Sequence, residues 1–148
     1  MQKPQTCSIA RALDVLGERW TFVILREAIS GTSRFADFRA ALGVAPDVLS
    51  DRLATLVAAG VLEKRPYREP GSRARHSYHP TEAGNELRVV LGALQQWGDA
   101  HCPWEGGPTV ERRSVEGDRP LHVAFVDETG TEVPLDGVAF VRTAAYPT

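Results

Sequence analysis

The stretch APDVLSDRLATLVAAGVLEKRPY, residues 45–67, constrains the fold most, because it predicts a helix that runs directly into a basic strand. Pro46 opens the predicted helix, at the position where proline is favoured. Leu49, Leu53 and Leu56 follow at spacings of four and three, so they share one helix face. These leucines must face the interior of their own domain, and the start of the helix is left to face outward.

The outward positions at this helix start are the ones expected to meet a partner. They are Ala45, Pro46, Asp47, Ser50 and Asp51, with Arg52 at the edge. Ser50 can hydrogen bond a base or a phosphate. Arg52 can clamp a phosphate, or it can pair with an acid such as Asp51 or Glu63.

The neighbouring segments predict further elements of the same domain. Helical spacing of apolar residues and flanking glycines predict helices over 8–16, 19–29, 34–42 and 81–101, and two strands within 61–69 and 75–81 around a turn at 70–73. Thr6 or Ser8 is expected to cap the first helix, and Ser33 the third. Trp20, Phe35 and Phe38 are expected to pack in the core rather than to recognise a ligand.

The predicted hairpin carries a local positive charge on a chain whose net charge is only −2. From Lys64 to Arg75 there are five basic residues and one acid, a net charge of +4. Arg68, Arg73 and Arg75 are therefore candidate phosphate contacts. The plainer interpretation is a solvated loop.

The predicted elements follow the order of a winged helix-turn-helix. Two short helices are joined by a glycine turn, and a basic hairpin comes after them along the chain. A helix fits the major groove of B-DNA, and its first turn reaches base edges. A β wing beside it can lay arginines along the phosphates. Ser33 and Arg34, ahead of the third helix, are expected to add to this attraction.

The fold class expected is mainly α with a small β wing, an α+β arrangement, in two parts. Residues 1–105 are predicted to form the winged helix-turn-helix domain, and residues 106–148 a β-rich extension. Alternating runs around the Thr129–Gly130 turn predict a hairpin or three strands there. An isolated hairpin is marginal in water, so this extension must lean on the long helix or on a partner chain.

Several ordered blocks between residues 7 and 101 resemble the HxlR family of bacterial transcriptional regulators, relatives of the MarR type. They are a cysteine just before IARALDVLGERW, then LREAISGTSRFADFRAAL, VLSDRLATLVAAGVLEK and YHPTEAGNEL. The resemblance implies a homodimer that binds double-stranded operator DNA through its fourth helix and dimerises through its first and last helices. It also implies that Cys7 could sense electrophiles or oxidants, although an idle thiol is the alternative.

The two aspartates at the helix start depart from the family pattern, which often has basic or amide residues there. Asp47 can accept a hydrogen bond from cytosine N4 or suit the positive end of the helix dipole, while the other candidates supply the attraction. Alternatively, affinity for DNA is weak.

Other classes of function find little support in the sequence. No motif of an enzyme active site is present, no cofactor is expected, and His76 and His79 would point to opposite faces of a strand, which disfavours a metal. No long apolar run or secretory-type N-terminus occurs, so no membrane and a cytoplasmic location are expected. We therefore expect a regulator, a repressor with a possible small-molecule effector, and hold a ligand-binding or protein-interaction module without DNA binding as the alternative.

If Asp47 reads a base, Asp47→Ala will change the preferred DNA sequence more than the overall affinity. Binding-site selection on random duplexes measures the preference, and titration of a selected duplex measures the affinity. An unchanged base preference would contradict base reading by Asp47.

Overall fold

The computed structural model describes residues 6–146, and the chain forms two compact units, Met1–Arg88 and Val89–Thr148. The predicted domain division between residues 105 and 106 stays a prediction. No helix in the described part of the chain is long and apolar enough to cross a membrane.

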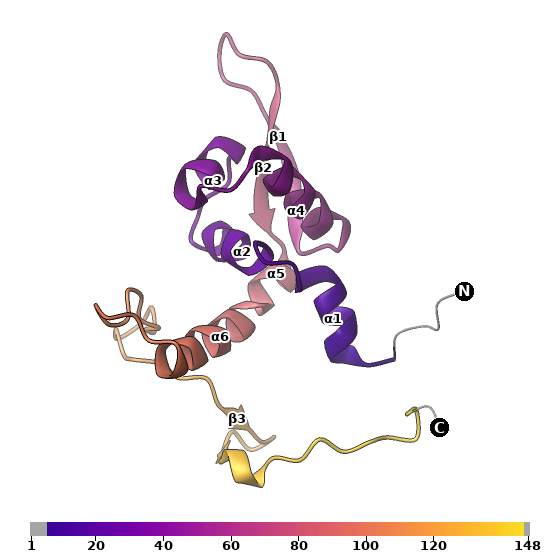
Figure 1. Cartoon of the computed structure of the whole chain (residues 1–148), viewed down its shortest axis with the longest axis vertical. Coiled ribbons are helices and arrows are strands. Elements are labelled where there is room, and N and C mark those ends of the chain that lie inside the picture. The colour runs from indigo at the N-terminus through magenta and orange to yellow at the C-terminus, as the bar shows by residue number, and fades with distance from the viewer. Residues whose placement is uncertain (1–5, 147–148) are drawn as a thin grey trace. The chain divides into compact units, whose positions relative to one another are not determined.

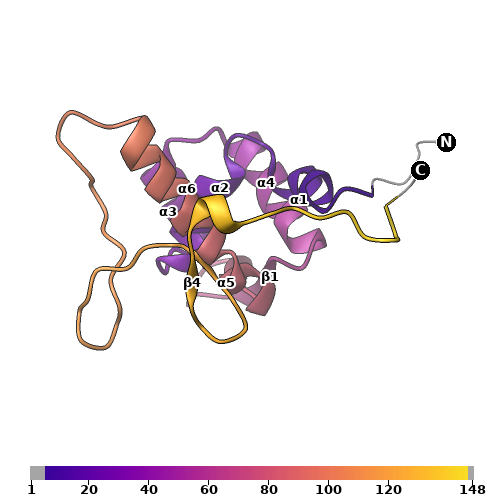
Figure 2. The ribbon, with the colours of Figure 1, turned by 90° about the horizontal axis from the view of Figure 1, so that it is seen from below.

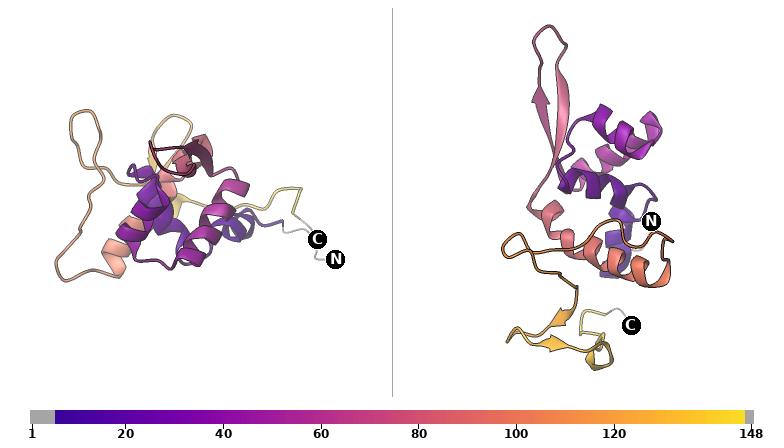
Figure 3. Two further views of the ribbon diagram at one scale, coloured as in Figure 1. Left: turned by 90° about the horizontal axis from the view of Figure 1, so that it is seen from above. Right: turned by 90° about the vertical axis from the view of Figure 1, so that its left-hand side faces the viewer.

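The first unit has the winged-helix order, which confirms the predicted fold class of helices with a small β wing. Its elements are α1 (Ser8–Leu16), α2 (Thr21–Ile29), α3 (Phe35–Leu42), α4 (Pro46–Ala58), β1 (Leu62–Tyr67), β2 (Arg75–Pro80) and α5 (Glu82–Glu86). The loop of the β1–β2 hairpin extends past α3 and α4 in Figure 1, and the right-hand view of Figure 3 shows the same projection. The wing is thus free to contact something beyond the helices.

The core of this unit is built around the leucine row of α4. Leu49, Leu53 and Leu56 are at most 1% exposed, as their spacing predicted, and α4 packs against α2, α3 and β1. Phe38 is fully buried, whereas Phe35 is only half-buried. Trp20 is also half-buried and precedes α2, so the prediction that it is a core residue was only partly right.

The predicted N-caps of the first and third helices were wrong. Cys7 occupies the N-cap position of α1 and Arg34 that of α3, and neither makes a side-chain capping bond. Ser33 lies one residue too early, because its carbonyl is used elsewhere: it accepts the Tyr78 N–H at 2.8 Å. Its backbone therefore belongs to the wing sheet rather than to the helix start.

That bond is part of a connection between the start of α3 and the wing. β1 and β2 pair antiparallel from Leu62–Pro80 to Tyr67–Arg75, and Arg34 forms an isolated antiparallel bridge with Ser77 of β2. The segment ahead of α3 thereby adds a third, very short strand to the hairpin. As a result, Arg34 is held beside the middle of β2.

The predicted long helix from 81 to 101 is interrupted at Leu87. The Leu87 N–H bonds the carbonyl of Gly84, three residues back, at 3.2 Å, so the turn tightens there and α5 ends. Gly84 is buried against the start of the wing: a Cβ at this position would lie 2.2 Å from the carbonyl oxygen of Val61. Only glycine permits this close approach.

The second unit contains little regular structure besides one helix. Its elements are α6 (Arg88–His101), β3 (Phe125–Val126), β4 (Glu132–Val133) and the 3-10 turn η1 (Leu135–Gly137). β3 and β4 pair antiparallel around the expected Thr129–Gly130 turn, but in two residue pairs only, and most of the extension runs as loops (Figure 2).

Two adjacent glutamines of α6 fasten this extension to the helix. The Gln96 amide donates to the carbonyl of Val123 at 3.1 Å and accepts the Val123 N–H at 2.9 Å. Gln95 donates to the carbonyl of Val110 at 2.7 Å and accepts from Arg112 at 2.9 Å. The loops therefore lean on α6 through side-chain amides instead of through a sheet.

Thr81→Ala is expected to lower the free energy of unfolding by about 1–2 kcal/mol, the usual cost of losing an N-cap. The Thr81 hydroxyl donates to the carbonyl of Gly60 at 2.5 Å and accepts the Gly84 N–H at 3.2 Å, joining α4, the wing and α5. Urea denaturation followed by circular dichroism measures the change. Thr81→Ser, which keeps the hydroxyl, is the control, and an equal loss in both variants would contradict the capping role.

Candidate nucleic-acid interface

The front of α4 presents an exposed polar surface. Ala45, Pro46, Asp47, Ser50 and Asp51 are all exposed, and Arg52 is half-buried at the edge, as the leucine row requires. The helix begins at Pro46 after an extended Ala45, and the preceding Gly43 has a φ of 63°, the left-handed conformation that glycine favours at a helix end. This tight turn lets α4 start directly after α3.

The polar side chains at this helix start are free to contact a ligand. Within the described residues, the side chains of Asp47, Ser50 and Asp51 make no hydrogen bond or ion pair. Asp47 lies in the first turn and does not cap the helix through a hydrogen bond. Its carboxylate can still stabilise the helix by its favourable interaction with the positive end of the helix dipole. Arg52 is paired with an acid, but with Glu18, at 3.7 Å, rather than with Asp51 or Glu63.

The wing supplies positive charge that has few acidic partners. Arg65 pairs with Glu63 on the same strand. Among the described residues, the remaining wing cations have no acidic partner: Lys64, Arg68, Arg73 and Arg75. Arg68 donates instead to the carbonyl of Ser72 at 2.9 Å, which orders the hairpin loop.

Arg34 is held by two residues of the wing. Its guanidinium donates to the Glu69 carboxylate at 2.5 Å, and its charge lies 4.8 Å from the centre of the Tyr67 ring. Both ionic side chains are about half exposed, so the pair is worth little as a source of stability. Its effect is positional, because Glu69 covers a cation that would otherwise face solvent.

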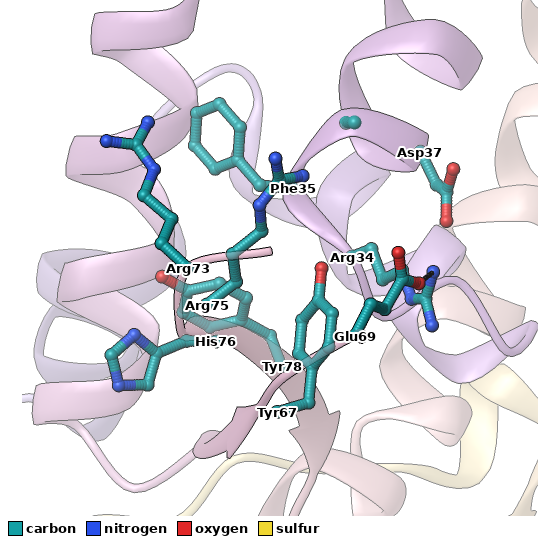
Figure 4. Close-up of a pocket in the computed structure, with 10 residues that line it drawn as sticks. Arg34, Phe35, Asp37, Tyr67, Glu69, Arg73, Arg75, His76 and Tyr78 are labelled. Atoms are coloured by element: carbon teal, nitrogen blue, oxygen red, sulfur yellow. Dashed lines mark hydrogen bonds and ion pairs between the residues drawn. The ribbon is translucent and has the colours of Figure 1, made fainter. Parts of the chain in front are cut away.

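These side chains surround a hollow of about 390 Å³ between the start of α3 and the wing. Figure 4 shows the Arg34–Glu69 pair on one side of the Tyr67 ring and Arg73 with Arg75 on the other. The Tyr78 phenol also lines it, and partial burial raises the pKa of this phenol above its usual value. The phenol therefore stays protonated at neutral pH and can act as a hydrogen-bond donor.

The structure brings together some of the predicted site residues and leaves others apart. Arg34, Arg73 and Arg75 share the hollow, and the α4 start forms a separate exposed surface in the same unit. Tyr67, Glu69 and Tyr78, which also line the hollow, are not among the site residues predicted from the sequence. Strand alternation would not have grouped them, because Tyr67 pairs with Arg75 and Tyr78 with Lys64, positions on opposite faces of the hairpin, and Glu69 lies beyond β1. The contacts of Arg34 with Tyr67 and Glu69 join residues distant along the chain.

Cys7 is an exposed free thiol at the N-cap of α1. Arg11, one turn on, donates to the carbonyl of Thr6 at 2.6 Å and to the Ser8 hydroxyl at 3.2 Å. The role of Cys7 as a redox sensor stays a prediction. The described residues contain no cluster of three or more side chains that could hold a metal ion.

An exposed helix start following a tight turn, next to a cationic β wing, defines a winged helix-turn-helix protein. Comparison with known families makes this more specific, because residues 15–105 match the HxlR-like helix-turn-helix family. The chain belongs to this family, and the predicted resemblance is confirmed.

A relative from Mycobacterium tuberculosis strain H37Rv, described as an HTH-type transcriptional regulator, is 42% identical over 106 residues. The match covers 72% of this chain and 66% of the relative, so the chain spans about two thirds of that protein's length.

Solved structures agree with the fold. The crystal structure of PA1607, described as a transcription factor, superposes with a TM-score of 0.81 at 29% identity, over 95% of this chain and 98% of that chain. The redox regulator HypR in its reduced form gives a TM-score of 0.59 at 25% identity, over 65% of this chain and 94% of that one.

Glu69→Gln is expected to strengthen the binding of polyanions, because it removes the wing's acidic partner of Arg34 and frees that guanidinium. Salt elution from a heparin column measures the effect, and the variant should elute at higher salt than the parent chain. Glu116→Gln, an equal charge change at an exposed acid outside the wing, is the matched control. Equal shifts in both variants would show that only net charge matters.

Proposed function

We propose that this chain is a DNA-binding transcription regulator, which places the start of α4 in the major groove and the wing on the flanking phosphates. The single observation that supports this best is that an exposed α4 start lies in the same unit as wing cations for which residues 6–146 provide no acidic partner. The family and the description of its relatives as HTH-type transcriptional regulators support the same function.

The aspartates at the start of α4 are explained if the wing and the α4 start have different roles in DNA binding. The wing cations supply sequence-independent attraction to phosphates, which the acidic α4 start lacks. Asp47 and Ser50 are short and exposed, so they can approach base edges, where a carboxylate accepts from cytosine N4. Specificity therefore resides in α4 and affinity in the wing.

The proposal includes a homodimer. In the first unit, Ile9 and Leu13 lie one turn apart on α1 and are 67% and 54% exposed. In the second unit, Val90 and Leu94 of α6 are 40% and 49% exposed at the same spacing. Each helix thus has an apolar face that a second copy would cover, and a two-fold dimer would read half-sites about one helical turn apart.

Repression is the regulatory outcome that we propose, since a dimer bound over a promoter blocks access without any contact beyond the DNA. Release by an oxidant, an electrophile or another small molecule stays a prediction. HypR, to which 65% of this chain is similar, is a redox regulator, and Cys7 is an exposed thiol that such chemistry would reach.

Replacement of both Arg73 and Arg75 by Ala is expected to flatten the salt dependence of DNA binding. Each lost phosphate contact lowers the slope of log affinity against log salt by about 0.9, so the double variant should lose about 1.8 for each protomer bound. Fluorescence anisotropy with a duplex from the region flanking the chain's own gene, titrated at several salt concentrations, measures the slope.

The control variant carries Arg88→Ala and Arg119→Ala, which remove the same charge at exposed positions outside the wing. Its slope should stay near that of the parent chain. If the parent chain binds no duplex even at low salt, the regulator proposal fails and the alternative applies, a winged-helix module for ligands or proteins. If the parent chain binds a duplex and the wing variant has the same salt slope as the parent, the wing lies outside the interface.

A further inference from the structure

The tetrapeptide Val-Ala-Phe-Val occurs twice in the second unit, at residues 123–126 and again at 138–141. Both copies lie beyond residue 105, where the match to the family ends. Because the side chains are the same, the two segments have the same preference for an extended, half-buried strand. Their surroundings in the structure are very different.

The first copy is held by backbone hydrogen bonds, and its phenylalanine is less exposed than that of the second copy, 47% for Phe125 against 90% for Phe140. Gln96 of α6 bonds both backbone groups of Val123, and Phe125 pairs with Val133 of β4. Together with α6 this segment lines an apolar hollow of about 580 Å³. The lining residues that matter here are Val89, Ala93 and Trp97 from the helix and Val123, Phe125 and Leu135 from the extension.

The second copy has no strand partner among the described residues. It follows η1, has no regular secondary structure, and leaves Phe140 90% and Val141 81% exposed. We refer to residues 138–146 as the arm. An exposed phenylalanine beside an exposed valine, in a segment of high β propensity, is the kind of surface that proteins cover.

Charge complementarity suggests what covers it. The hairpin segment 125–136 carries four acids and no lysine or arginine, whereas the only charged side chain of the arm is Arg142. Among segments of this chain, the arm therefore suits a position beside the hairpin. In the structure, however, the arm of the same chain leaves Phe140 in solvent.

We propose that the arm of a second copy of this chain lies over the hollow between α6 and β3, with its Phe140 side chain inserted beside Trp97 and Phe125. The proposal rests on the homodimer proposed above and adds where part of its interface lies. In a two-fold dimer each copy donates one arm and receives the other, so both hollows are filled.

The exchange removes two weaknesses of the isolated second unit. Trp97 and Phe125, which are 61% and 47% exposed, gain an apolar cover along with Phe140 itself. The β3–β4 hairpin has only two residue pairs, and the partner's Val138–Val141 segment would lie against the Val123–Val126 segment of identical sequence. Because each copy donates its arm and receives the other, the same contact occurs twice about the two-fold axis.

Disulfide trapping between two differently tagged copies tests the exchange. Both copies carry Cys7→Ser and Cys102→Ser; one adds Phe140→Cys and the other Ala93→Cys, a residue of the hollow. Mixing followed by mild oxidation should give a disulfide-linked heterodimer on a non-reducing gel. The matched control replaces Phe140→Cys with Val115→Cys, a fully exposed valine of the same unit, and should give little heterodimer.

Sedimentation equilibrium supplies the second measurement. Phe140→Ser should raise the dimer dissociation constant by about tenfold or more, from the loss of two buried phenylalanines, while Val115→Ser should change it by less than about twofold. Circular dichroism checks that each variant keeps its helices.

Four results would overturn the inference. They are heterodimer trapping no greater than in the Val115→Cys control, a disulfide found only within one chain when both cysteines share it, an unchanged dissociation constant for Phe140→Ser, and a small molecule found in the hollow by native mass spectrometry. If the parent chain still dimerises in these cases, only the arm exchange is lost. A parent chain that stays monomeric at all concentrations would remove the proposed homodimer as well.

Discussion

Burial of the leucine row of α4 is the interaction on which the rest of the first unit depends. Leu49, Leu53 and Leu56 pack against α2, α3 and β1, and this contact sets the rotation of α4 about its own axis. A helix turned by one residue would expose leucines and hide Asp47 and Ser50, at a cost of several kcal/mol for the lost apolar burial. The recognition surface is therefore a consequence of the core.

The wing is positioned by a different kind of contact. The bridge between Arg34 and Ser77 and the bond from Tyr78 to Ser33 attach the segment ahead of α3 to the hairpin through backbone groups. Backbone bonds tolerate changes in side chains, so the wing stays attached while its surface charge is free to vary. Glu69 is an example, because its carboxylate neutralises the charge of Arg34 on a surface that is otherwise positive.

Much of the helical order could be predicted from the sequence, because apolar spacing and glycine punctuation act locally. The bounds of α1 and of the wing strands follow from such patterns. The break at Leu87 could not be predicted from apolar spacing; it occurs where Gly84 lies against the carbonyl of Val61, more than twenty positions earlier in the chain. The β-rich extension could not be predicted in detail for the same reason. Its segments have the composition of strands, but Gln95 and Gln96 of α6 bond the backbone carbonyls of Val110 and Val123.

The sequence by itself determined which face of α4 is buried, where the wing lies and what charge it carries, because these depend on residue type at fixed spacing. Only the tertiary structure decided that Arg34 meets Glu69 and Tyr67, that Arg52 pairs with Glu18, and that the two Val-Ala-Phe-Val segments have different environments. The physical reason is that contacts between residues distant along the chain depend on how elements pack. Identical segments can therefore be hydrogen bonded in one place and unpaired in another.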